Sequence, residues 1–140
     1  MKIYFAASIR GSGGIDPGTC RKFVDRLRRH GRVLTEHICD AVVKNDFDEG
    51  TDKEIYERDI RWLKSADAVV AEVSLPSLGV GYEIGKAEEW GKPILCLYCT
   101  NSPGKLSAMI NGSENLTVKK YGDLSEALVL IDDFLKHSPP

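Results

Sequence analysis

The stretch from Ala68 to Trp90 reads AVVAEVSLPSLGVGYEIGKAEEW and joins a strand-like run to a helix-like run. Its first six residues are apolar except for Glu72 and lack strict alternation, which is typical of a strand covered on both faces. From Gly79 onward, apolar residues recur at helical spacing. A buried strand followed by a helix is the repeating unit of a parallel sheet, so this stretch predicts an α/β fold.

The rest of the chain repeats this alternation. Asp16-Pro17 and the capping box Thr51-x-x-Glu54 are helix-start signals. We expect strands near 3–7, 32–35, 68–73, 94–98 and 116–119, and helices near 17–30, 51–65, 79–90, 103–110 and 123–136. Residues 37–50 are polar without a clear period, and we expect a loop there. The 140 residues suit one domain, 1–140, with a frayed tail at 138–140.

Composition narrows the class of protein. Apolar residues make up 42% of the chain, charged residues 29%, and the net charge is -2 without a basic stripe. Polymeric nucleic acid is therefore an unexpected partner, whereas a small phosphorylated molecule is compatible. No apolar run has the length of a membrane helix, and only Met1 and Lys2 precede the first strand. We expect a protein of the cytoplasm, and also of the nucleus, that does not bind membranes.

Cysteine usage leads to a further expectation. A reducing compartment disfavours disulfides between Cys20, Cys39, Cys96 and Cys99. Cys96 and Cys99 are spaced as C-x-x-C, but they lie in an apolar run without a second pair at zinc spacing. We expect them in the core or at a strand end, and no histidine pair has metal spacing either. The sequence predicts neither a metal nor a cofactor.

Two segments that follow strands are suited to binding an anion. Ser8 to Gly14 is rich in glycine, which lets backbone N–H groups crowd around a phosphate, and Arg10 can add a charged contact. The alternative is a flexible turn. In the second segment, Ser77 and Gly79 stand at the start of a helix, where N–H groups bind anions. Parallel sheets bind ligands at the carboxyl ends of their strands, so both segments belong to one expected site.

Two acidic residues lie on helix faces that are otherwise apolar. Glu83 shares a stripe with Val80 and Ala87, and Asp59 lies four residues after Ile55 and four before Leu63. Two carboxylates across a cleft are the minimum needed to cleave a glycosidic bond. The alternatives are a helix-dipole role for the first acid and a salt bridge to an arginine such as Arg10 for the second. Charged neighbours of the second acid, including Arg58, are expected on the polar side.

Read together, these segments resemble a known family. The resemblance rests on Tyr4-Phe5-x-x-Ser8-Ile9-Arg10-Gly11, Leu34-Thr35-Glu36-His37, Asp59-x-x-Trp62-Leu63, Ala68 to Val73, Pro76 to Gly85, and Leu106 to Ile110. In that order they look like the 2'-deoxynucleoside 5'-phosphate N-hydrolases of the nucleoside 2-deoxyribosyltransferase superfamily. The resemblance implies a flavodoxin-like or Rossmann-like three-layer sandwich with a five-stranded, mostly parallel sheet, and a homodimer.

The resemblance also implies a role for each matching residue. Glu83 would be the nucleophile with Tyr4 beside it, and Asp59 would act near the base as proton donor or positioning group. The implied phosphate contacts are Ser8, Ile9, Arg10, Gly11, Ser77 and Gly79, with Ser107 donated by the neighbouring subunit. His37 and Met109 would line the base side of the pocket.

The sequence departs from the transferases of the superfamily at two positions. Those enzymes typically have an acid at the position of Ser77 and an asparagine from the neighbouring subunit at that of Ser107. A hydroxyl donates to a phosphate that an acid would repel. The expected activity is hydrolysis of 2'-deoxynucleoside 5'-monophosphates through a glycosyl-Glu83 intermediate. The alternatives are a nucleoside 2-deoxyribosyltransferase, a CMP-type ribonucleotide N-hydrolase and a non-catalytic nucleotide-binding module.

Overall fold

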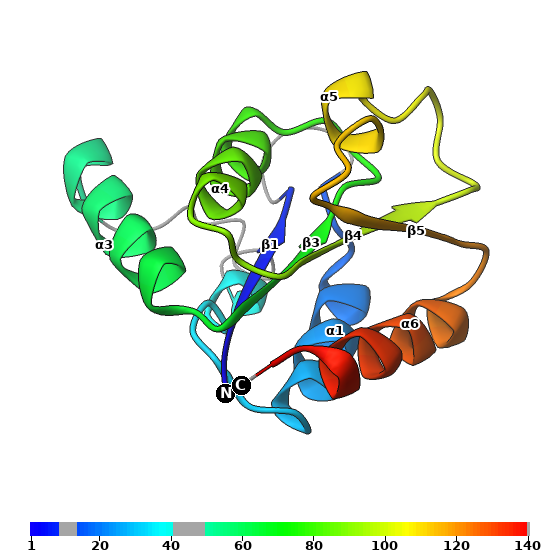
Figure 1. Ribbon diagram of the computed structural model, residues 1–140, viewed down its shortest axis with the longest axis horizontal. Coiled ribbons are helices and arrows are strands. Elements are labelled where there is room, and N and C mark those ends of the chain that lie inside the picture. The colour runs from blue at the N-terminus through cyan, green and yellow to red at the C-terminus, as the bar shows by residue number, and fades with distance from the viewer. Residues whose placement is uncertain (9–13, 41–49, 140) are drawn as a thin grey trace.

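The computed structural model describes residues 1–8, 14–40 and 50–139. Their strands form a five-stranded sheet in the order β2-β1-β3-β4-β5 (Figure 1). The strands are β1 (Lys2–Ala7), β2 (Arg32–Val33), β3 (Ala68–Glu72), β4 (Ile94–Cys99) and β5 (Thr117–Tyr121). Every neighbouring pair is parallel, which confirms the expected α/β sandwich. The strand order reverses between β1 and β3, and ligands of such sheets bind outside the carboxyl ends of the strands at that point.

Helices cover both faces of the sheet (Figure 1). Helices α1 (Pro17–Arg28) and α6 (Leu124–His137) lie on one face, α3 (Asp52–Ser65) and α4 (Leu78–Glu89) lie on the other, and α5 (Ala108–Asn111) is a short helix beyond β4. Side chains of a strand alternate between faces. Phe5 therefore packs in the core with α1 and α6, whereas Tyr4 packs in the core with α3 and α4. This alternation directs Tyr4 toward the helix that carries Glu83.

The two helix starts predicted from the sequence are confirmed. The Asp16 carboxylate accepts the Thr19 N–H at 3.1 Å, with Pro17 in the first turn of α1. The Thr51 hydroxyl oxygen accepts the Glu54 N–H at 3.2 Å at the start of α3. These bonds satisfy backbone donors that a helix leaves free at its first turn.

The short helix before β5 begins later than predicted. Instead of running from about Pro103, α5 begins at Ala108, with Ser107 as its N-cap. Gly104 has a φ of 88°, which is incompatible with a right-handed helix. The chain from Pro103 to Ser107 is therefore a loop.

The expectation of four free cysteines is wrong. Cys20 of α1 and Cys39 are both fully buried and joined by a disulfide, with their Cα atoms 5.6 Å apart. Cys20 on α1 and Cys39 in the segment after β2 pack in the same core cluster, and their separation in sequence gives no sign of this contact. Cys96 and Cys99 are free and lie in β4, the second at its end, as expected.

The predicted loop at 37–50 falls mostly at 41–49, outside the described residues. Within the described ranges, no helix is both long enough and apolar enough to cross a membrane.

Candidate active site

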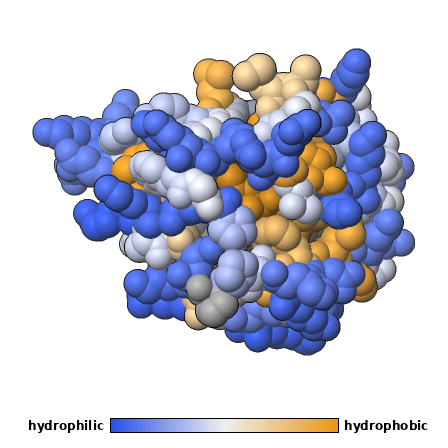
Figure 2. All heavy atoms as spheres, in the orientation of Figure 1, coloured by the Kyte–Doolittle hydropathy of each residue, from blue (hydrophilic) through white to orange (hydrophobic). Residues whose placement is uncertain are grey.

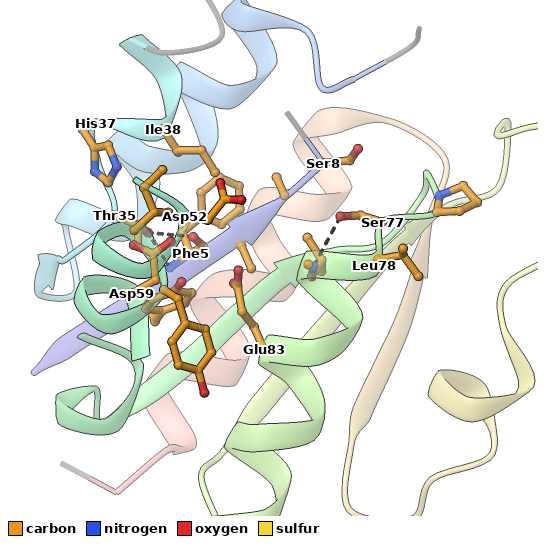
Figure 3. A pocket seen from close by; sticks show the side chains of 18 residues that line it. Phe5, Ser8, Thr35, His37, Ile38, Asp52, Asp59, Ser77, Leu78 and Glu83 are labelled. Atoms are coloured by element: carbon orange, nitrogen blue, oxygen red, sulfur yellow. Dashed lines mark hydrogen bonds between the residues drawn. The ribbon is translucent and has the colours of Figure 1, made fainter. Parts of the chain in front are cut away.

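A cavity of about 660 Å³ opens at the carboxyl edge of the sheet, between α3 and the start of α4. Its walls come from the end of β1, the segment after β2, α3, and the turn into α4 (Figure 3). The lining includes Tyr4, Ser8, Thr35, His37, Asp52, Tyr56, Asp59, Ser77, Gly79 and Glu83. Ser8 and Ser77, one from each segment expected to bind an anion, therefore meet there.

Glu83 extends from α4 into the cavity (Figure 3). Helix α4 buries Val80, Ile84 and Ala87 against the sheet, so the side chain at position 83 is held close to that apolar face. The pKa of the Glu83 carboxyl is raised to about 7, mainly by burial and also by the nearby charge of Asp59, while the hydrogen bond from Tyr4 acts in the opposite direction. Such a carboxyl exchanges its proton near neutral pH, which suits a group that must act as a carboxylate in one step.

Tyr4 is a hydrogen-bond donor to this carboxyl group. Its side chain is 2% exposed, and its phenol is hydrogen-bonded to Glu83. Burial, together with the charges of Glu83 and Asp59, raises the pKa of the Tyr4 phenol far above its ordinary value. The hydroxyl therefore keeps its proton and orients one carboxylate oxygen of Glu83.

Asp59 reaches the same cavity from α3 (Figure 3). Its Oδ1 accepts two hydrogen bonds from Arg58, from Nε at 3.0 Å and from an Nη at 2.9 Å. The Arg58 guanidinium also lies 4.7 Å from the centre of the Trp62 ring. The expectation that Arg58 belongs to the polar side is thus wrong, because it folds back between an acid and an aromatic ring.

The anion-binding side of the cavity contains Ser8, Ser77 and Gly79. Ser77 caps α4 by accepting the Val80 N–H on its hydroxyl oxygen at 3.3 Å, which leaves the hydroxyl proton able to donate elsewhere. N–H groups of the first turn of α4 have no intrahelical acceptor and can bind an anion. Ile9, Arg10 and Gly11 lie outside the described residues.

The opposite end of the cavity is more apolar and aromatic. The His37 ring lies 5.3 Å from the Trp62 ring, centre to centre. The Tyr56 and Tyr82 hydroxyls are 3.1 Å apart and link α3 to α4. Of these four residues His37 and Tyr56 line the cavity, and aromatic rings suit a flat base better than a phosphate.

Sequence reasoning missed Asp52 and Tyr56 as lining residues, and it named Thr35 only as part of the motif Leu34-Thr35-Glu36-His37. Thr35 is buried, and its hydroxyl donates to the Phe5 carbonyl at 2.6 Å and accepts the Phe5 N–H at 3.0 Å. Asp52 and Tyr56 lie on the same face of α3 as Asp59, seven and three residues before it. This helical spacing from Asp59 is the signal in the sequence that could have identified them.

Ser107 and Met109 do not line this cavity. They border a second cavity of about 720 Å³, whose wall on the other side includes Ser77, Leu78 and Tyr82. Met109 is 83% exposed and Leu78 is 97% exposed. Apolar side chains protrude over α5 and the start of α4 in the space-filling view (Figure 2). The prediction that both residues complete the site of a neighbouring subunit stays a prediction.

Comparison with known proteins identifies the family of this chain. Residues 3–122 match the family described as Nucleoside 2-deoxyribosyltransferase. The chain is similar to the 5-hydroxymethyl-dUMP N-hydrolase of Mus musculus, at 54% identity over 89% of this chain and 72% of that protein. It is similar to the Homo sapiens protein of the same name, at 45% identity over 99% and 81%.

The fold is shared with a solved structure. The CMP N-glycosidase of Clostridium botulinum superposes with a TM-score of 0.70 at 19% identity, covering 94% of this chain and 99% of that one. The two proteins therefore share the arrangement of the sheet and helices. With the family match over most of its length, this chain belongs to the nucleoside 2-deoxyribosyltransferase family.

Proposed function

We propose that this protein hydrolyses the N-glycosidic bond of 2'-deoxynucleoside 5'-monophosphates, releasing a free base and 2-deoxyribose 5-phosphate. The observation that carries the proposal is the half-buried Glu83 carboxyl, which is hydrogen-bonded to Tyr4 and shares one cavity with Asp59. The similar proteins of Mus musculus and Homo sapiens are named as N-hydrolases of 5-hydroxymethyl-dUMP, which is a nucleotide of this class.

Glu83 is the nucleophile of the proposed reaction. Its carboxylate attacks C1' and forms an ester with the deoxyribosyl phosphate, while the bond from C1' to the base breaks through an oxocarbenium-like transition state. The Tyr4 hydrogen bond holds the attacking group in place. Water then attacks C1', the ester bond breaks, and Glu83 is regenerated as a carboxylate.

Asp59 serves the departing base. From α3 it lies on the side of the cavity that is bordered by His37 and Tyr56, where a base fits. In the proposed cycle its carboxylate positions the leaving base and the incoming water, and the proton that the water loses on attacking C1' ends on the released base. Arg58 restrains one of its oxygens, and the other faces these groups.

The 5'-phosphate occupies the other end of the cavity. Ser8, Ser77 and Gly79 bind it there, together with Ile9, Arg10 and Gly11 of the glycine-rich segment. Binding energy from a phosphate remote from C1' helps to orient the sugar for attack. His37 contacts the base.

We extend the proposal to a homodimer with a shared site. The apolar side chains of Leu78 and Met109 are almost wholly exposed beside Ser107, and a second subunit would bury them. Ser107 would then reach the phosphate of the partner, and Met109 would border its base side. We place the protein in the cytoplasm and nucleus, where free nucleotides occur.

A substrate panel tests the proposed function. The protein is incubated with 5-hydroxymethyl-dUMP, the four common deoxynucleoside monophosphates, CMP, and the matching deoxynucleosides, and free base is measured by chromatography. Base release from deoxynucleoside monophosphates, with at least about a tenfold loss when the phosphate is removed, supports the proposal because unpaired phosphate donors cost about 1–3 kcal/mol each. Equal cleavage of deoxynucleosides, or preferential cleavage of CMP, contradicts it. A second base added to the reaction separates hydrolysis from base exchange.

A further inference from the structure

Glu72 is a buried acid that the proposed reaction does not use. It ends β3 and is 7% exposed. Two residues earlier, Val70 packs in the core with α1 and α6. The alternation of the strand therefore points Glu72 to that face, away from the face that carries Tyr4 and Glu83.

Both carboxyl oxygens of Glu72 have hydrogen-bond donors. Oε1 accepts the backbone N–H of Ser74 at 2.6 Å, and Oε2 accepts the hydroxyl of Tyr121 at the end of β5. The Ser74 hydroxyl oxygen in turn accepts the Cys99 N–H at 2.8 Å at the end of β4. One carboxyl group and one hydroxyl thus tie the chain leaving β3 to the ends of two other strands.

The tied segment leads directly to the phosphate side of the substrate cavity. The last backbone bond from β3 to its neighbour joins the Val73 N–H to the Leu97 carbonyl. Three residues beyond Ser74, Ser77 caps α4 and lines the substrate cavity. The hydrogen bonds of Ser74 with Glu72 and Cys99 hold this short connection against the sheet between Val73 and the start of α4.

Glu72 also lies close to the other phosphate segment. It is paired in register with Ala7, the residue before Ser8. A separate cavity of about 310 Å³ on this face is lined by Ser8, Glu72, Ser74 and Tyr121, among others. Ser8 borders this cavity and the substrate cavity alike. Glu72 therefore lies next to both chain segments that are proposed to bind the phosphate, the one that begins at Ser8 and the one that leads from Ser74 to Ser77.

We propose that Glu72 and Tyr121 are positioning residues for phosphate recognition, holding Ser74 so that Ser77 and the first turn of α4 meet the 5'-phosphate. This inference rests on the proposed function. A site held in advance by buried hydrogen bonds loses less freedom when ligand binds. Burial and the hydrogen bond to Glu72 raise the pKa of the Tyr121 phenol, so its hydroxyl remains a donor throughout the neutral range.

The test compares four variants with the wild type. Tyr121→Phe removes one donor, Glu72→Ala removes both acceptors, and Glu72→Gln keeps an oxygen for Ser74 and an amide that can donate to Tyr121. Asp132→Asn is the control, since Asp132 binds Arg26 and His30 between α1 and α6 and lines none of the cavities described. Each is assayed for KM and kcat with 5-hydroxymethyl-dUMP. Each is also combined with Glu83→Gln, and Kd is measured by calorimetry for this nucleotide and its deoxynucleoside.

Tyr121→Phe should raise KM and Kd for the monophosphate about five- to tenfold, the factor that corresponds to one hydrogen bond. Its kcat should change less than its KM, because the phosphate is still bound in the saturated complex and its remaining contacts still orient the sugar. Glu72→Ala should have a larger effect, while Glu72→Gln and Asp132→Asn should stay near wild type. Affinity for the deoxynucleoside should be unchanged throughout.

Two results would overturn the positioning role. One is an unchanged monophosphate Kd in folded Tyr121→Phe, and the other is an equal loss of affinity for nucleotide and deoxynucleoside. If Glu72→Ala does not fold, Tyr121→Phe decides alone. These Kd measurements need no turnover, so absence of hydrolysis by the wild type would count against the proposed function and leave the positioning test intact.

Discussion

Glu83 has two requirements that conflict in an apolar pocket. It must be ionised to attack C1', yet burial favours its protonated form and raises its pKa to about 7. The Tyr4 hydrogen bond acts in the opposite direction and favours the carboxylate. The chemistry of the site therefore depends on a balance between burial, Asp59 and Tyr4.

Replacing this carboxyl group should abolish hydrolysis without abolishing binding. Glu83→Gln keeps the side-chain shape and an oxygen that can accept from Tyr4. Loss of a nucleophile costs orders of magnitude in rate, so we expect kcat to fall by at least about a thousandfold. Rapid-quench chromatography measures the rate and calorimetry measures the Kd. Retention of a tenth of the wild-type turnover would contradict the assignment.

The pH dependence follows from the same carboxyl group. Because the attacking form is the carboxylate and its pKa is about 7, kcat/KM should fall as pH decreases through about 7. Tyr4→Phe removes the interaction that lowers this pKa, so the acidic limb should move to higher pH. Asp59→Asn removes a like charge, so that limb should move to lower pH, with an overall loss of rate. Limbs that coincide in all three proteins would show that another group titrates.

At the scale of elements, local signals in the sequence located most helices and strands. Asp16 with Pro17, and Thr51 with Glu54, mark helix starts because the bonds they make are local. The start of α5 was misplaced, since apolar residues near Leu106 suggested a helix that the backbone of Gly104 excludes. Local sequence patterns do not indicate which glycine adopts a positive φ.

The candidate site was predictable to a similar degree. Asp59 and Glu83 were visible as acids on apolar helix stripes, and both line the cavity. The contact of Arg58 with Trp62 and Asp59 was not visible, because a long side chain on a helix can lie in either direction. The pairing of Cys20 with Cys39 depends on how α1 and the segment after β2 pack in one core cluster, which local patterns do not report.

The disulfide gives a prediction about α1. It closes a loop of 19 residues in sequence, which in the chain-entropy account stabilises the fold by about 3 kcal/mol. Cys20→Ser should therefore lower the free energy of unfolding by about 2–3 kcal/mol, measured by urea denaturation without reductant. Cys96→Ser, at a free buried cysteine, is the control for loss of a thiol. With excess reductant, wild type and Cys20→Ser should converge, and a difference that persists would assign the loss to packing.

At the scale of the whole molecule, the homodimer with a shared site stays a proposal. Ser107 and Met109 face the second cavity rather than the one that holds Glu83. A subunit-mixing experiment distinguishes a shared site from a self-contained one. Glu83→Gln protein is mixed with Ser107→Ala protein and the subunits are allowed to exchange. One site of each heterodimer then has both wild-type residues, so activity should rise above that of either parent.

Two controls make the mixing experiment decisive. Subunit exchange is followed by native mass spectrometry, and the Ser107→Ala homodimer must show a raised KM. If both conditions hold and activity does not rise, the two residues serve the site of the same subunit.

The most direct test of the central claim is the configuration of the product formed when methanol competes with water. Attack by Glu83 followed by attack of solvent inverts C1' twice, so the anomeric configuration of the substrate is retained. We predict that 5-hydroxymethyl-dUMP in aqueous methanol gives the methyl β-2-deoxyriboside 5-phosphate, identified by NMR. The α anomer would show a single displacement by solvent and would contradict a glycosyl-Glu83 intermediate.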